Sequence, residues 1–464
     1  MNRSKIKTRM PLASIACLLL AYNVFAQPAP ELNQAITLEQ AIVVANQSDP
    51  WHQENVLQQQ AVKYRSVAAG QLPDPKLSVS MMNLPLDSWA IDQEPMTQLK
   101  VAIAQQFPRG ETRELKQQKL QIEAERFPIL RENRKAQVAA KISELWLQAF
   151  QAQKIIELIE NDRVLFEQML DVAKANYSST LGRTRQQDVI RAQLELAQLQ
   201  DWLTEQAMHK EAALAKLNEW LYPYHETSEL RLLDFNRAPA YRVTTELPAL
   251  EVTYAGILVT SQMDTNAIVN ILLQHPAIKA LDIKYQSAQK STDIARQGYK
   301  PQWGVNASYG YRDDAPDGSS RTDFFSIGVS LDIPLFTEHK QAQLVSASVA
   351  ETEAVKTEKL LMAKNMLGQV QSLAKELARY QQRADLYETQ LLAQSRDQAS
   401  AALTAYTHDD GDFSEVVRAK IAELNMRIAK LKIDVAIQKT IAKLNYFLNQ
   451  SNSKFTAAQQ QGEY

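Results

Sequence analysis

The sequence of 464 residues contains a single cysteine, Cys17, and few glycines and prolines (12 and 17). One cysteine excludes an intramolecular disulfide framework and any zinc or iron–sulfur site built from several cysteines. The 51 basic residues do not outnumber the 53 acidic ones, so the chain lacks the positive excess that nucleic-acid-binding proteins use to neutralise phosphates. With 45% hydrophobic and 22% charged residues, the chain is neither collagen-like nor disordered, and its composition favours long helices.

The first 26 residues have the features of a secretory signal peptide. Four basic residues precede an apolar run over 11–21, and Val24-Phe25-Ala26 places small residues at the −3 and −1 positions. Cys17 lies inside the apolar run, which argues against a lipidated N-terminus. Removing residues 1–26 leaves 47 basic and 53 acidic residues, and no later stretch reaches the roughly 18 apolar residues of a membrane helix. We therefore expect an exported protein.

Motifs that recur about 226 residues apart indicate an internal duplication. Three proline pairs have an offset of 226, and two further motifs have an offset of 227. These are Pro50 and Pro276, Pro75 and Pro301, Pro108 and Pro334, Arg191-Ala192 and Arg418-Ala419, and the Ala-Lys-Leu-Asn motifs at 215–218 and 442–445. The expected organisation is a signal peptide at 1–26, a first repeat at 27–221, an insertion at 222–265, a second repeat at 266–450 and a tail at 451–464.

Each half contains two segments in which apolar residues alternate with small or polar ones, as in β-strands with one apolar face. The apolar positions are Leu77, Val79 and Met81, then Leu99, Val101 and Ile103, and in the second half the odd positions of 305–311 and 325–331. The segments are about 8 to 11 residues long, the length of a tilted transmembrane strand. Alternation alone, however, favours a soluble antiparallel sheet that buries its apolar face.

Apolar residues at 3-4 spacing predict coiled-coil helices after each strand pair. One seam covers 142–173 with a single polar position, Arg163, and a second covers 363–391 and fades at Gln394 and Gln398. Helices this long cannot fold back into a globular core, so the sheet and the helices together favour an extended protein over a soluble sheet domain.

The first long helix is expected from Thr112 to Asn176, which gives a length of about 97 Å, or less if Pro128 breaks its first turns. A glycine-bearing turn follows each seam, at 177–183 and 406–412. Each turn leads to a returning helix of roughly 35 residues, which ends near Leu221 in the first half and near Leu448 in the second.

Four strands per chain are too few to close a membrane barrel, because the smallest bacterial outer-membrane barrels have about eight. Open strand edges in lipid would leave backbone groups unpaired. We therefore expect a homotrimer, in which three protomers form a twelve-stranded barrel that is continued by long helical hairpins. The predicted fold class is mixed α and β, mainly α.

This architecture resembles the TolC-type outer-membrane efflux proteins over essentially the whole mature chain. The stretch 72–116 is similar to the heavy-metal branch of that family, the outer-membrane partners of cobalt-zinc-cadmium and copper-silver pumps. Three motifs carry this likeness: Pro73-Asp74-Pro75, Glu94-Pro95-Met96-Thr97 and the Gln105–Gly110 sequence QQFPRG. Members of the copper-silver branch often have a lipidated N-terminal cysteine, so the lack of a well-placed one favours the cobalt-zinc-cadmium side.

The resemblance implies a passive duct in the bacterial outer membrane, with its helical barrel in the periplasm and with neither enzymatic activity nor a cofactor. The implied partners are a periplasmic membrane-fusion adaptor, an inner-membrane proton-driven pump of the RND type and outer-membrane lipid, and the implied solute is a heavy-metal cation. The insertion at 222–265 is expected to wrap around the equator of the helical barrel. A multidrug or type I secretion duct stays open as an alternative, as does a periplasmic coiled-coil adaptor.

The resemblance also assigns a gate to acidic residues that open the returning helices, here Asp188 and Glu415. Glu415 ranks first, because the second hairpin of the family lies closer to the axis. The simpler alternative is an acidic side chain stabilised by the helix dipole. The six histidines show no close ligand pair, so no metal site is expected.

Two further surfaces are candidates for function. The hairpin turns lie farthest from the membrane and are expected to dock the adaptor; their candidate residues are Gly182, Arg183, Gly411 and Asp412. The polar strand positions Asn306, Ser308, Ser326 and Ser330 are predicted to face a water-filled lumen, together with Gly304 and Gly328. The odd positions of 305–311 and 325–333 are then predicted to face lipid.

Overall fold

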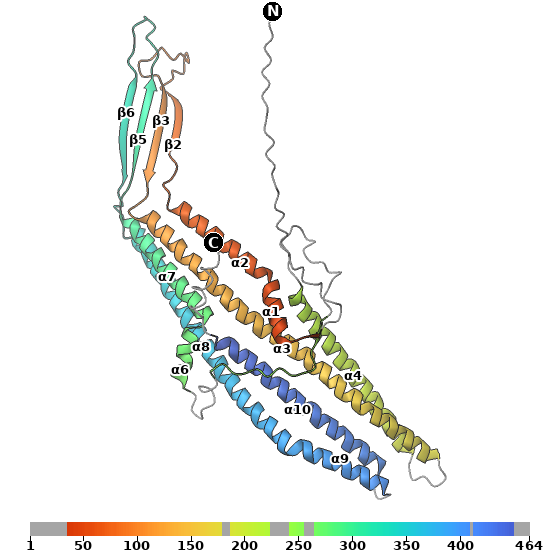
Figure 1. Ribbon diagram of the computed structural model, residues 1–464. Helices are drawn as coiled ribbons and strands as arrows, with labels where there is room; N and C mark the ends of the chain where they lie inside the picture. The colour runs from red at the N-terminus through yellow and green to blue at the C-terminus, as the bar shows by residue number, and fades with distance from the viewer. Residues whose placement is uncertain (1–34, 179–185, 223–240, 255–263, 409–411, 450–464) are drawn as a thin grey trace, which may run out of the picture.

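The computed structural model describes residues 35–178, 186–222, 241–254, 264–408 and 412–449. The described chain is elongated, with a β-sheet at one end and helices that run away from it (Figure 1). No helix lies against either face of the sheet in this view. The fold is mainly helical, as the sequence predicts.

The same order of elements occurs in both halves of the chain: two short helices, two strands and a pair of long helices. In the first half these are α1 (Leu38–Ser48), α2 (Pro50–Ala69), β2 (Lys76–Met82), β3 (Gln98–Phe107), α3 (Thr112–Ser178) and α4 (Gln186–Leu221). In the second half they are α6 (Thr265–Leu273), α7 (Pro276–Arg296), β5 (Gln302–Tyr311), β6 (Phe324–Asp332), α8 (Gln341–Leu386) with its continuation α9 (Leu392–Thr407), and α10 (Phe413–Phe447). A 3-10 turn (Gln297–Tyr299) follows α7, and a π-helical turn (Tyr387–Leu391) joins α8 to α9.

The four long strands form one antiparallel sheet in the order β2-β3-β5-β6. The register of this sheet places the apolar positions of neighbouring strands directly opposite each other. Val79 lies opposite Val101, Val101 opposite Tyr309, and Tyr309 opposite Phe325. Because residues directly opposite each other share a face, the apolar positions predicted separately for each strand form one continuous apolar face.

The coiled-coil seams predicted from the sequence are confirmed by burial. In α3, the apolar seam positions from Ile142 to Ala173 are buried or half-buried. The one polar member, Arg163, is exposed and donates to Glu167 (2.8 Å) and to Gln200 on α4 (3.1 Å). In α8, the buried residues include the seam positions Met366, Val370, Leu373 and Leu377.

The helix α3 continues through Pro128, so this proline does not shorten it. Proline has no backbone N–H, and the carbonyl four residues earlier therefore loses its donor within the helix. That carbonyl belongs to the buried Ala124, and the side chain of Gln59 on α2 donates to it at 3.1 Å. A side chain of a neighbouring helix thus replaces the missing backbone hydrogen bond.

The repeated prolines Pro50 and Pro276 both occupy the first turn of a helix. Asp49 caps α2 by accepting from the Trp51 amide (3.1 Å). His275 caps α7, where Nδ1 accepts from the Ala277 amide (3.1 Å). Its Nε2 lies 3.0 Å from the Tyr446 carbonyl, which can only accept, so the ring is neutral with its proton on Nε2.

A short parallel pair of strands, β1 (Ala35–Ile36) and β4 (Arg242–Val243), crosses the middle of the helical region. The buried Trp146 indole on α3 donates to the Ile36 carbonyl (3.0 Å). Farther along, Gln438 and Asn445 of α10 accept from the backbone amides of Leu250 and Thr253, both at 2.8 Å. The described part of the segment between the halves is therefore held against helices of both halves.

The role of Gln59 predicts a coupling with Pro128. Gln59→Leu leaves the buried Ala124 carbonyl without this donor and should lower the free energy of unfolding by about 1–3 kcal/mol. In a Pro128→Ala background, a backbone N–H is present again, and the same substitution should cost less. Thermal unfolding of the purified variants measures both costs, with the exposed neighbour Gln58→Leu as control. Equal costs in the two backgrounds would contradict the compensation.

The buried cap His275 predicts a pH dependence of stability. Burial lowers the pKa of His275 and outweighs the hydrogen bond to Tyr446, which raises it. Histidine in the unfolded chain titrates near 6.5. Below that pH the unfolded chain binds the proton more readily, so stability is full above about pH 6.5 and falls as the pH drops toward the lowered pKa.

His275→Asn keeps an acceptor for the cap but does not titrate. The melting temperature of this variant should therefore change less between about pH 7.5 and 5.5. His209, which is exposed, provides the matched control as His209→Asn. A variant with the pH response of the unmodified protein would show that His275 is not the responsible group.

Candidate functional site

The apolar face of the sheet is exposed in the protomer. Phe325, Ile327 and Val329 are each 72% exposed, and the same face continues over the other strands. Its other large exposed side chains are Leu77, Val79, Met81, Leu99, Val101, Ile103, Trp303, Tyr309, Tyr311 and Leu331. A soluble antiparallel sheet buries its apolar face, and the described protomer provides no such cover.

The opposite face of the sheet carries mainly small and polar side chains, with Met82 and Phe324 at its loop end. Asn306, Ser308, Ser326 and Ser330 all lie on it, since Ser308 pairs with Ser326 and Asn306 with Gly328. A Cβ atom at Gly328 would come within 2.8 Å of the Asn306 side-chain oxygen, so this glycine makes room for its neighbour. Most side chains on this face are therefore short and polar.

The two edges of the sheet are β2 and β6. Within the described residues, each edge strand pairs with one neighbour only. Backbone N–H and C=O groups along the free side of an edge strand need a partner, and this need is absolute in lipid.

The two candidate gate residues have different surroundings. Both lie in the first turn of a returning helix, as the sequence predicts, Asp188 in α4 and Glu415 in α10. Asp188 is 6% exposed, whereas Glu415 lies on the surface. Of these two carboxylates, Glu415 is the one that the protomer presents to solvent.

Of the four candidate docking residues, three lie outside the described residues: Gly182, Arg183 and Gly411. The fourth, Asp412, is the N-cap of α10 and accepts from the Ser414 amide at 3.1 Å. The spacing Asp412-x-x-Glu415 is that of a capping box, a signal for the structural role of both residues that the sequence analysis missed.

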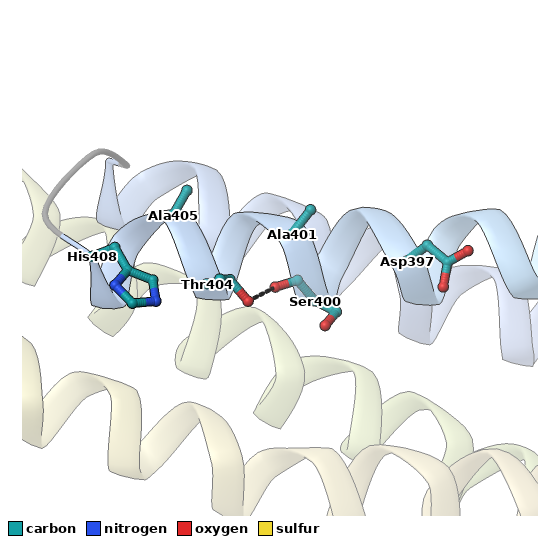
Figure 2. Close-up of a pocket in the computed structure, with 6 residues that line it drawn as sticks. All are labelled: Asp397, Ser400, Ala401, Thr404, Ala405 and His408. Atoms are coloured by element: carbon teal, nitrogen blue, oxygen red, sulfur yellow. Dashed lines mark hydrogen bonds between the residues drawn. The ribbon is translucent and has the colours of Figure 1, made fainter.

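A shallow hollow lies on the surface of α9 close to the end of its hairpin (Figure 2). Four small side chains at helical spacing form it, with Asp397 at one end and His408 at the other; they are Ser400, Ala401, Thr404 and Ala405. The Thr404 hydroxyl donates to the Ser400 carbonyl (2.9 Å). The sequence does not single out these positions, because serine, alanine and threonine in a helix do not by themselves indicate a function.

Within the described ranges, no three His, Cys, Asp or Glu side chains form a group that could hold a metal ion. A search of the same ranges finds no helix with the length and apolarity that crossing a membrane requires.

Comparison with solved structures identifies the fold. No protein-family model and no curated protein matches the chain. The outer membrane protein VceC of Vibrio cholerae matches with a TM-score of 0.71 at 14% identity, over 89% of this chain and 96% of that one. The Campylobacter jejuni CmeC outer membrane channel matches with a TM-score of 0.69 at 12% identity, over 98% and 97%.

CusC, whose structures concern folding and transmembrane channel formation, matches with a TM-score of 0.67 at 12% identity, over 89% of this chain and 92% of that one. The protein thus has the fold of these outer-membrane channels along nearly its whole length. At this identity the likeness concerns the fold.

The different burial of the two acidic residues predicts different effects on stability. Asp188→Asn replaces a buried carboxylate, and we expect the free energy of unfolding to fall by about 1–3 kcal/mol. Glu415→Gln changes an exposed side chain and should stay within about 0.5 kcal/mol of the unmodified protein. Thermal unfolding compares the two variants directly. If Glu415→Gln destabilises as much as Asp188→Asn, Glu415 serves mainly the helix end.

Proposed function

We propose that this protein is the exit duct of an efflux system in the bacterial outer membrane. The observation that carries this proposal is the continuous, exposed apolar face of the sheet, which has the strand length and alternation of a membrane-spanning barrel wall. Lipid is the surrounding that makes such a face favourable. The fold shared with solved outer-membrane channels supports the same conclusion.

A homotrimer follows from the two free sheet edges. Pairing β6 of one protomer with β2 of the next would satisfy both edges, and three protomers would close a barrel of twelve strands. In this arrangement the polar face, with Asn306, Ser308, Ser326 and Ser330, lines the lumen. The long helices then continue the duct into the periplasm.

The further assignments rest on the sequence resemblance. The two repeats and the insertion at 222–265, placed around the equator of the helical part, form part of the proposal. At the far ends of the hairpins, the turns with Gly182, Arg183, Gly411 and Asp412 would dock a membrane-fusion adaptor that connects the duct to an RND-type pump.

Three copies of Glu415, joined by Asp188 if it becomes accessible, would form an acidic gate that attracts cations. The three motifs between 73 and 110 support heavy-metal cations as the solute.

A pair of neighbouring arginine substitutions tests the barrel. Val329→Arg places a charge on the lipid side and should destabilise assembly by about 2–4 kcal/mol per protomer near mid-membrane. Ser330→Arg places the same charge one residue further, on the lumen side, and should be tolerated. Trimer migration in outer-membrane fractions with and without heating measures assembly. Normal assembly of Val329→Arg together with loss of Ser330→Arg would reverse the two faces.

A further inference from the structure

Only three of the residues in the four long strands are charged: Lys76, Lys100 and Asp332. The register places all three on the polar face. Lys100 lies opposite Ser80 on one side and Gly310 on the other, Lys76 lies opposite Ala104, and Asp332 lies opposite Gln302. The apolar face of the strands carries no charge, so the whole charge of the sheet is collected on one side.

The single negative charge of these strands is already neutralised. The Asp332 carboxylate forms an ion pair with Arg109, whose guanidinium also donates to the Lys300 carbonyl at 2.8 Å. Neither Lys100 nor Lys76 forms an ion pair with any described residue. The polar face therefore has an uncompensated positive charge.

The loops beyond the strand ends carry further acidic residues, and two of these accept hydrogen bonds within their own loop. Asp323 accepts from the Tyr309 hydroxyl and from the Arg312 amide. Asp317 accepts from the Ser319 amide at 3.0 Å. Arg321 donates to the backbone carbonyls of the other loop, at Asp92 and Glu94. The Arg321 contacts join the two loops through backbone carbonyls, and neither Lys76 nor Lys100 takes part in them.

The Lys100 side chain is longer than the side chains directly opposite it. Gly310 has no side chain, and Ser80 has a short one. Lys100 is half-buried, and a lysine side chain of this kind can cover apolar surface with its stem while its ammonium stays in water. It belongs to the inner strand β3, so an adjoining protomer that pairs with an edge strand does not cover it.

We infer that Lys100 determines the ion selectivity of the strand-lined part of the duct, with Lys76 adding to it toward the helical end. The inference rests on the proposed function, because it requires the polar face to line a lumen shared by three protomers. Three ammonium groups around one lumen form a positive ring, and rings of charged side chains within low-dielectric walls select ions by charge. Such a ring favours anionic solutes and opposes free divalent cations, so a heavy-metal cation admitted by the proposed acidic gate would pass the barrel more readily in a neutral or anionic complex.

The inference narrows the solute class of the duct. A free divalent cation is repelled twice as strongly as a monovalent one by the same ring. An anionic or uncharged compound, or a metal held in an anionic complex, meets no such barrier. Lys100 thus makes passage through the barrel depend on the charge of the transported species.

Selectivity is measured on purified protein in planar bilayers, from the reversal potential under a potassium chloride gradient. Lys100→Gln should raise the permeability of potassium relative to chloride by about twofold or more, and a magnesium chloride gradient should give a larger change. Lys100→Arg keeps the charge and should keep the selectivity, and Lys63→Gln removes an exposed lysine of α2 as the matched control. The difference should shrink in about 1 M salt, where screening reaches only about 3 Å.

A cysteine variant makes the test independent of folding. In Lys100→Cys channels, a positively charged thiol reagent should restore the original selectivity, and a negatively charged one should reverse it, within the same inserted channel. Val101→Cys, on the apolar face of the same strand, should not respond. The unsubstituted protein, which has no cysteine once residues 1–26 are removed, is the control with the same reagents.

The outcomes separate this inference from the proposed function. Channels whose selectivity is the same in Lys100→Gln, and which do not respond to reagents at position 100, would overturn the inference and leave the duct intact. Failure of the unmodified protein to form any channel would overturn the proposed function and the inference together. A change in selectivity confined to Lys63→Gln would also overturn the inference.

Discussion

The apolar face of the four-stranded sheet needs a cover that the protomer does not provide. More than ten large apolar side chains lie on this face, and no helix packs against it (Figure 1). Burying apolar surface stabilises by roughly 25 cal/mol per Å², so a face of this extent has a strong preference for a nonaqueous surrounding. The same sheet has two unpaired edges. Apolar cover and edge pairing are separate needs, and the described protomer by itself meets neither.

The helix α3 connects this sheet to the rest of the molecule. It begins four residues after β3 ends and packs along its length against α2, α7, α4 and α10. Trp146 and Phe150 lie in the core near its middle, and Phe166 and Leu170 in a second core toward its far end. Arg427 of α10 donates to Asp162 of α3 at 3.0 Å, which adds a polar contact between the halves. One continuous helix therefore connects the strand region to the far end of the first hairpin.

The sequence predicted the periodic parts of this structure well. The seam of α3, the start of α3 at Thr112 and the alternation of the strands all follow from local patterns in the sequence. The strands β1 and β4 have two residues each and therefore no period to detect. The Gln59 hydrogen bond and the burial of Asp188 depend on neighbours that are distant in sequence, and no local pattern contains them. The positive charge of the polar face appears only once the register sets Lys76 and Lys100 on the same side.

The π-helical turn at Tyr387–Leu391 explains why the second seam fades. A π-helical turn is one extra residue within an α-helix. If the 3-4 spacing of the seam before the turn continued unchanged, Gln394 and Gln398 would be buried, but both are exposed. If the spacing is shifted by one residue, the seam continues at Ala399, which is fully buried, and then at Ala402 and Tyr406, which pack against the second core. The widened turn thus resets the coiled-coil frame. Beyond it, the Tyr406 ring lies 5.7 Å from that of Phe413 of α10, so the last turns of the hairpin still belong to the second core.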